Sequence, residues 1–168
     1  GLFIERKGIL DFVDRAKKLP QYEFVWFGEL KLSLVPEKIK KAVKTDLKNL
    51  HFPGYVSQEL LREAYSGSDL YIFPTFEETE GIVLLDALAT KADTIIRDIE
   101  IYKNLKDGKE IYKAKDKKEF YKKIKLILEG KYPSLKEEGY KLAQEKSIEN
   151  IGLKLKKYYQ DLLEREEK

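Results

Sequence analysis

The middle of the chain combines a short apolar strand, an acidic loop and an apolar helix in one continuous stretch. Residues 70–73 are apolar and rich in β-forming side chains, and Pro74 ends the strand because it lacks a backbone donor. Residues 77–80 are polar, three of them acidic, and Gly81 follows them. Residues 82–89 then form an apolar run that predicts a buried helix. A strand that leads into a helix in this way is typical of an α/β protein.

The start of this predicted helix is suited to an anion. The first amide groups of a helix have no partner within it, and the helix dipole attracts negative charge. Acidic side chains beside such a site would repel a bare phosphate, but they accept hydrogen bonds from hydroxyl groups. A ligand with both a phosphate and hydroxyl groups, such as a nucleotide sugar, therefore fits the stretch.

The spacing of two acids bears on whether the stretch is a site. Any α/β protein contains strand–loop–helix units, and acidic residues at a helix start are ordinary caps. Glu78 precedes the helix, however, whereas Asp86 lies about one turn inside it, with seven residues between them. Because Asp86 is surrounded in sequence by leucine and alanine, we expect its carboxylate to need a partner. The spacing thus favours a binding site over a simple cap.

Apolar runs and helical patterns alternate along the rest of the chain. We predict strands at 23–27, 49–52, 70–73, 94–97 and, at an edge, 110–114. We predict helices at 9–19, 36–43, 57–65, 82–89, 99–104, 117–130, 135–145 and 148–165. This alternation predicts an α/β fold with a doubly wound parallel sheet, Rossmann-like, with ligands at the carboxyl ends of the strands. The loops at that edge are 5–8, 28–30, 53–56 and 75–81.

The composition excludes several classes of site. The chain has 168 residues, 42% of them hydrophobic, which suits one domain with a substantial core. It has no cysteine, so thiolate metal sites, disulfides and cysteine nucleophiles are excluded. The one histidine, His51, rules out a multi-histidine metal site, and we interpret it as an ordinary residue at a strand end. The net charge of +3 gives no strong case for a nucleic-acid partner.

Two further expectations concern the polypeptide as a whole. No run approaches 18 apolar residues and no signal peptide opens the chain, so we expect a cytoplasmic protein. The chain begins with Gly1 in place of methionine, and residues 1–4 look like the tail of a strand. We therefore expect a single domain over residues 1–168, with C-terminal helices at 135–165, cut from a longer polypeptide.

An ordered set of short motifs resembles a known enzyme family. Residues 78–87 are similar to the Glu-x7-Glu signature of the retaining glycosyltransferases of family four, with Asp86 in the second acidic position. The resemblance extends through Lys7-Gly8, Phe27-Gly28, residues 52–56 and residues 69–75. Enzymes of this family have the B-type glycosyltransferase fold, in which the active site lies between two Rossmann-like domains. The resemblance covers only the domain that binds the nucleotide donor.

The resemblance implies roles for the residues around the helix start. Glu78, as the catalytic carboxylate, would accept hydrogen bonds from the donor sugar near the reacting carbon. Asp86 would accept from both ribose hydroxyls, although the family usually has the longer glutamate there. The first amides of the helix would cap the diphosphate and the loop beside them would line the donor, which involves Thr79, Glu80, Gly81, Ile82 and Val83.

Two basic residues are implied as partners of the diphosphate. Lys7, followed by Gly8, would bridge it as a point charge. The family usually has an arginine five residues before this lysine, where this chain has Leu2. Arg6 could supply that charge from another direction, or it could be a solvated turn residue. The base pocket would be walled by the turn after the second strand, at Pro53, Gly54 and Tyr55.

The implied reaction is retaining transfer of a hexose from a nucleotide diphosphate sugar, with UDP-hexose as the expected donor, to an acceptor hydroxyl. The basic residues and the helix start would stabilise the charge that builds on the departing diphosphate. The chain has no Asp-x-Asp pair, so we expect neither a catalytic metal nor a cofactor. The expected partners are the nucleotide sugar and an N-terminal acceptor domain of the same polypeptide. This domain alone should bind donor weakly and not turn over.

A closer resemblance is to bacterial enzymes that glycosylate glycosyl-diacylglycerol. It rests on residues 6–12, 26–28 and 78–83, and it implies a full enzyme at the inner face of the membrane. Residues 103–131 contain 11 lysines against five acids, a surplus that could attract anionic lipid. The same surplus would also suit a solvated helix face, and the membrane patch could instead lie on the other domain.

Two other classes of function stay open. A non-catalytic Rossmann-like nucleotide-binding module would tolerate Leu2 and Asp86 in place of the usual family residues. A doubly wound signalling domain would need a phosphoacceptor aspartate at a strand end with acids near the first strand, and the sequence has no such cluster. Titration with UDP, GDP and their sugars tests the binding site itself.

Overall fold

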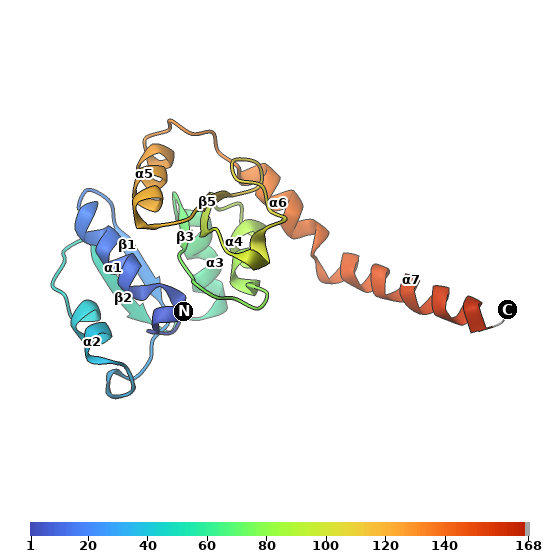
Figure 1. Ribbon diagram of the computed structural model, residues 1–168, viewed down its shortest axis with the longest axis horizontal. Helices are drawn as coiled ribbons and strands as arrows, with labels where there is room; N and C mark the ends of the chain where they lie inside the picture. Colours follow the sequence, from blue (N-terminus) through green and yellow to red (C-terminus); the bar gives the residue numbers. More distant parts are fainter. Residues whose placement is uncertain (167–168) are drawn as a thin grey trace.

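The computed structural model describes residues 1–166, which form alternating strands and helices (Figure 1). The strands in this part of the chain are β1 (Phe24–Phe27), β2 (Leu50–Gly54), β3 (Tyr71–Phe73), β4 (Thr94–Arg97) and β5 (Tyr112–Ala114). The α-helices are α1 (Ile9–Lys18), α2 (Glu37–Val43), α3 (Gln58–Gly67), α4 (Ile82–Ala89), α5 (Lys117–Leu128), α6 (Lys136–Glu145) and α7 (Ile148–Glu166). Short 3₁₀ helices are η1 (Glu5–Lys7), η2 (Leu32–Leu34) and η3 (Glu100–Tyr102).

Every strand pairing in the described chain is parallel. β1 pairs with β2, where Phe24 lies opposite Leu50. β3, β4 and β5 form a second group, in which Ile95 lies opposite both Ile72 and Tyr112. Parallel neighbours require a long crossover connection, which the intervening helices provide. The predicted α/β class with parallel strands is therefore found, although the strands divide into two sheets.

Residues 1–4 do not form the predicted strand end. The Ile4 amide donates to the Leu2 carbonyl over 2.9 Å, a tight turn that an extended strand cannot make. Gly1 is tied to β1 instead, because Trp26 Nε1 donates to its carbonyl over 2.8 Å and its amino group donates to the Phe27 carbonyl. The predicted strand is not found at residues 1–4, because the turn from Leu2 to Ile4 leaves only Gly1 bonded to β1.

Apolar side chains pack on both faces of the second sheet. In β4, Ile95 belongs to a core that includes residues of α1 and α5, whereas its neighbour Ile96 belongs to a core that includes residues of α4 and α6. Successive residues of a strand point to opposite faces, so helices cover both sides of this sheet. The first core also contains Phe12 of α1 and Phe24 of β1, and it therefore continues under both sheets.

The helices predicted from apolar spacing agree with the structure to within two residues at their ends, and the differences have local causes. Ser57 caps α3, as predicted, by accepting a hydrogen bond from the Leu60 amide over 3.2 Å. The predicted helix 117–130 ends at Leu128 because Gly130 adopts left-handed backbone with φ 67°. The predicted edge strand 110–114 is shortened to β5, since a turn closed by Gly108 and Ile111 occupies the preceding residues.

The last helix stands away from the body of the molecule (Figure 1). α7 packs against α6, and many of its apolar side chains face solvent, including Ile148 at 89% exposure and Leu153 at 66%. Between residues 1 and 166, no helix combines the length and the apolar character needed to span a bilayer.

Candidate functional site

Hydrogen bonds join the loop before α1 to the loop after β3. The Arg6 carbonyl accepts from the Phe76 amide over 2.8 Å and from Thr75 Oγ1 over 3.1 Å. The Arg6 guanidinium donates in turn to the Glu77 carbonyl over 3.1 Å. Thr75 is fully buried between the two loops. The two stretches that the sequence singles out therefore form one continuous surface.

Gly8 allows this close approach. Its backbone is left-handed, with φ 79°, and a Cβ there would lie 2.5 Å from the Pro74 carbonyl oxygen. Only glycine accepts both conditions without strain. The contact places the neighbouring Lys7 against the loop that carries Glu78.

Lys7 and Glu78 form an ion pair at the centre of this surface. The Lys7 ammonium donates to Glu78 Oε2, and the Thr79 amide donates to Oε1 over 3.1 Å. The Glu78 side chain is only 9% exposed. Burial raises the pKa of Glu78, but the hydrogen bonds from Lys7 and Thr79 outweigh it and hold that pKa below its usual value. The carboxylate is therefore charged at neutral pH and held in one orientation.

The N-terminus of α4 opens on the same side of the loop. Gly81 precedes the helix with φ 79°, and the first amide to bond inside it is that of Leu84, which donates to the Gly81 carbonyl over 2.8 Å. The amides of Gly81, Ile82 and Val83 come before this bond, and such amides have no partner in a helix. The Ile82 side chain is 63% exposed, so this first turn lies at the surface. It can bind an anion in the manner expected from the sequence.

Asp86 lies one turn further along α4 and is exposed. Partial burial nevertheless raises its pKa, and nearby Arg62 of α3 lowers it by less. Among the hydrogen bonds and ion pairs of the described residues, none involves the Asp86 carboxylate. The partner expected for Asp86 from the sequence is therefore not another residue of the described chain, and water reaches the carboxylate. Its oxygens stay available to a ligand that lies along the helix.

The remaining predicted residues fall into two groups, one on the loop beside Glu78 and one at the end of β2. Thr79 and Glu80 are exposed on the loop, beside Glu78. Tyr55 is 82% exposed at the turn after β2, but exposed Pro53 and buried Gly54 are the last residues of the strand itself, so the predicted turn begins two residues later. A cavity of about 300 Å³ lies next to this turn, and its lining does not include these three residues; it is formed by Phe3, Glu29, Leu30, Lys31, Leu32, Val43 and Phe52. Gly54 faces this lining, because a Cβ there would lie 3.2 Å from Glu29 Oε2.

A buried ion pair behind the loop was not predicted from the sequence. Arg97, the last residue of β4, donates to Asp11 Oδ2 of α1 over 2.5 Å and to the Pro74 carbonyl over 3.1 Å. Its guanidinium also lies 3.8 Å from the centre of the Phe76 ring. The pair thus fixes the loop between β3 and α4 from beneath. The position of Arg97 at the end of a predicted buried strand could have indicated such a pair, because a buried charge needs a partner.

Tyr102 is a second residue that the sequence did not reveal. Its buried hydroxyl lies under Gly81, where a Cβ would collide with it. This contact joins η3 to the N-terminus of α4, which are distant in sequence, so no local sequence pattern predicts it.

No group of three or more potential metal ligands occurs among the described residues. His51 lies on β2 at the sheet surface, where its Nε2 lies 2.6 Å from Glu23 Oε2. It belongs to neither of the two loops of the candidate site.

Comparisons with known proteins agree with one another. The family described as glycosyl transferases group 1 matches residues 1–130. Processive diacylglycerol alpha-glucosyltransferase of Acholeplasma laidlawii is 42% identical over 164 residues, which cover 97% of this chain and 49% of that protein. Alpha-galactosylglucosyldiacylglycerol synthase of Streptococcus pneumoniae (strain ATCC BAA-255 / R6) is 33% identical over 157 residues, which cover 90% of this chain and 41% of that protein. The chain thus spans less than half the length of these curated relatives.

A solved structure has the same fold. Anabaena Alr3699/HepE in complex with UDP superposes with a TM-score of 0.79 over 96% of this chain and 47% of that protein, at 14% identity. Its likeness confirms the predicted class, an α/β fold with parallel sheets.

Proposed function

This chain belongs to the glycosyl transferases group 1 family, and on that premise we propose that it is the donor-binding domain of a retaining hexosyltransferase that uses a UDP-hexose. One observation carries the proposal: a lysine, a carboxylate and the open N-terminus of a helix meet at one place. Lys7 pairs with Glu78 there, beside the first turn of α4. A nucleotide sugar needs such a combination, because it presents a doubly charged linker next to hydroxyl groups.

The diphosphate would lie between Lys7 and the first turn of α4. The ammonium of Lys7 has three donors, so it can contact the diphosphate while it still bonds to Glu78. It can also turn from Glu78 to the diphosphate. The amides of Gly81, Ile82 and Val83 would bind the phosphate oxygens, and exposed Arg6 would add charge at the rim. These donors would stabilise the negative charge that builds on the leaving group. We propose that they suffice without a metal ion or a cofactor.

The two carboxylates would take the sugar and the ribose. Glu78 is oriented and only 9% of its side chain is exposed, and it would accept hydrogen bonds from the hexose close to the reacting carbon. Asp86 lies further along α4 with no partner for its carboxylate among the described residues, and it would accept from the ribose hydroxyls. The base would lie towards Pro53, Gly54 and Tyr55 and the cavity beside them. The neighbour HepE binds UDP, which supports uracil as the base.

The acceptor is proposed from the relatives. Two of them are named for diacylglycerol glucosylation and for a galactosylglucosyldiacylglycerol product, which supports a glycolipid acceptor. Those proteins are more than twice as long as their match to this chain. We therefore propose that an N-terminal domain supplies the acceptor site, at the membrane surface, and that residues 1–168 alone bind donor without transferring it.

Titration of this chain with nucleotides tests the proposal. We expect NMR titration with UDP, UDP-glucose, GDP and GDP-mannose to give saturable shifts for the uridine compounds at millimolar concentration or below. Lys7→Ala should weaken binding by about tenfold, because a charge-assisted bond to phosphate is worth about 1.5–3 kcal/mol. Lys91→Ala, which removes an exposed ion pair with Glu137, is the matched control and should leave the nucleotide affinity unchanged. Absence of any nucleotide binding at millimolar concentration would overturn the proposed function.

A further inference from the structure

A hydroxyl group beside the proposed donor site is buried without a partner. Tyr102, at the end of η3, is 4% exposed, and no group among the described residues forms a hydrogen bond with its hydroxyl. Buried polar groups in folded proteins are nearly always hydrogen-bonded, because an unpaired one is costly. We therefore expect another state of the protein to supply a partner for this hydroxyl.

The hydroxyl faces the point where Glu78 and α4 meet. A Cβ at Gly81 would collide with Tyr102 Oη, and the same Cβ would lie 3.4 Å from Cγ of Glu78. Burial raises the pKa of Tyr102, and the charge of Glu78 raises it further. The hydroxyl consequently keeps its proton at any physiological pH and acts as a hydrogen-bond donor.

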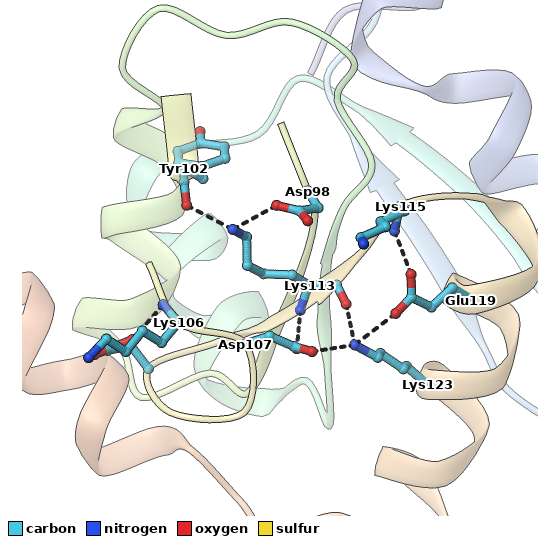
Figure 2. Close-up of polar contacts among 9 residues, drawn as sticks. Asp98, Tyr102, Lys106, Asp107, Lys113, Lys115, Glu119 and Lys123 are labelled. Atoms are coloured by element: carbon cyan, nitrogen blue, oxygen red, sulfur yellow. Dashed lines mark hydrogen bonds and ion pairs between the residues drawn. The ribbon is translucent and has the colours of Figure 1, made fainter. Parts of the chain in front are cut away.

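The backbone and ring of Tyr102 are fixed from the other side. Figure 2 shows its carbonyl accepting a hydrogen bond from Lys113 Nζ, over 2.9 Å, and the same ammonium pairing with Asp98 over 2.7 Å. The ring packs near Phe73, with the two centroids 6.4 Å apart. Tyr102 is therefore held in place, and a partner for its hydroxyl must come to it.

Glu78 is an acceptor close to this hydroxyl, and its present partner can be drawn away by the donor. Its carboxylate is bound by Lys7 in the structure. A diphosphate competes for that ammonium, because it offers more negative charge than one carboxylate does. Once Lys7 turns towards the phosphates, the Glu78 carboxylate, whose side chain is only 9% exposed, loses a bond that it must replace.

We propose that Tyr102 is a positioning residue of the donor site, whose hydroxyl donates a hydrogen bond to the Glu78 carboxylate when Lys7 turns to the diphosphate. The bond keeps Glu78 aimed at the sugar while the donor is bound. This inference rests on the proposed function, since it requires a ligand that carries a diphosphate.

The test compares two tyrosine-to-phenylalanine variants of this chain. Tyr102→Phe should weaken UDP-glucose binding in an NMR titration by about tenfold, the value of a hydrogen bond to a charged group. Its melting temperature should stay the same or rise, because no bond of the free chain is lost. Tyr112→Phe removes a hydroxyl that donates to the Pro133 carbonyl, so it should lower the melting temperature and leave UDP-glucose binding unchanged.

A double-mutant cycle identifies the partner of the hydroxyl. In a Glu78→Ala background, Tyr102→Phe should have no further effect on UDP-glucose affinity, because the acceptor is already gone. A tenfold loss that persists in that background would overturn the assigned partner, and an unchanged affinity of Tyr102→Phe in the wild-type background would overturn the inference. If the wild-type chain itself binds no UDP-glucose, the proposed function fails as well, and the two failures are thereby distinguished.

Discussion

At the scale of single residues, Lys7 and Glu78 hold each other in the free chain, although each is proposed to hold a different part of the donor. Glu78→Ala should leave UDP binding nearly intact, because it releases the Lys7 ammonium for the diphosphate. The same variant should remove the part of UDP-glucose affinity that comes from the sugar. Parallel NMR titrations with UDP and UDP-glucose measure both effects. A loss of UDP affinity as large as the loss of UDP-glucose affinity would contradict the assignment of Glu78 to the sugar. In the proposed longer polypeptide with an acceptor domain, we expect this variant to abolish transfer.

The pH dependence of stability also belongs to the residue scale. The pKa of Glu78 in the folded chain lies below the ordinary value of 4.5, through its bonds to Lys7 and Thr79. A depressed pKa stabilises the folded state above the unfolded pKa, and this contribution is lost as the pH falls through the folded value. Urea unfolding should therefore show Glu78→Gln less stable than wild type at pH 7, with the difference shrinking below about pH 4.5. A difference that grows towards acid would contradict this.

At the scale of elements, the pair of Asp11 and Arg97 connects α1 to β4 and to the loop after β3. Asp11→Ala should destabilise the chain by about 3–5 kcal/mol, because it leaves a buried guanidinium uncompensated. Asp14→Ala, on the same helix, removes an exposed pair with Lys18 and should cost about 0–1 kcal/mol. Chemical denaturation of the two variants measures the contrast. Equal losses for both would mean that Arg97 finds other partners.

Elements whose pattern is local were predictable, and contacts between elements were not. The apolar spacing of α1 and the short run of β3 mark their positions, because each depends on neighbours in sequence. The three acids and the one glycine of the 77–81 loop likewise marked the candidate site. Arg97, Tyr102 and the division into two sheets depend on which segments meet in the fold. The turn at residues 1–4 shows the limit, since four apolar-rich residues fit a strand end or a turn equally well.

At the scale of the whole molecule, α7 extends from the body (Figure 1), and apolar side chains are exposed along its length. Ending the chain at Lys146 should leave the melting temperature of the body unchanged, because the apolar side chains of α7 face solvent and its main contact is with α6. Ending it at Ser134 removes buried Leu135 and Ala143 as well, and should lower the melting temperature clearly. Differential scanning fluorimetry of the two truncations gives the comparison. A large loss from removing α7 alone would show that it contributes to the core.

The two sheets share an apolar core, but within residues 1–166 no strand of one bonds to a strand of the other. Nonpolar packing is not directional, whereas a ladder of hydrogen bonds resists sliding. The loops that carry Lys7 and Glu78 are joined by hydrogen bonds across the boundary between the two sheets. A ligand bound by both loops would add contacts across this boundary and stiffen the domain. Deuterium uptake at the backbone amides of β1 and β3 should then slow in step when nucleotide is added.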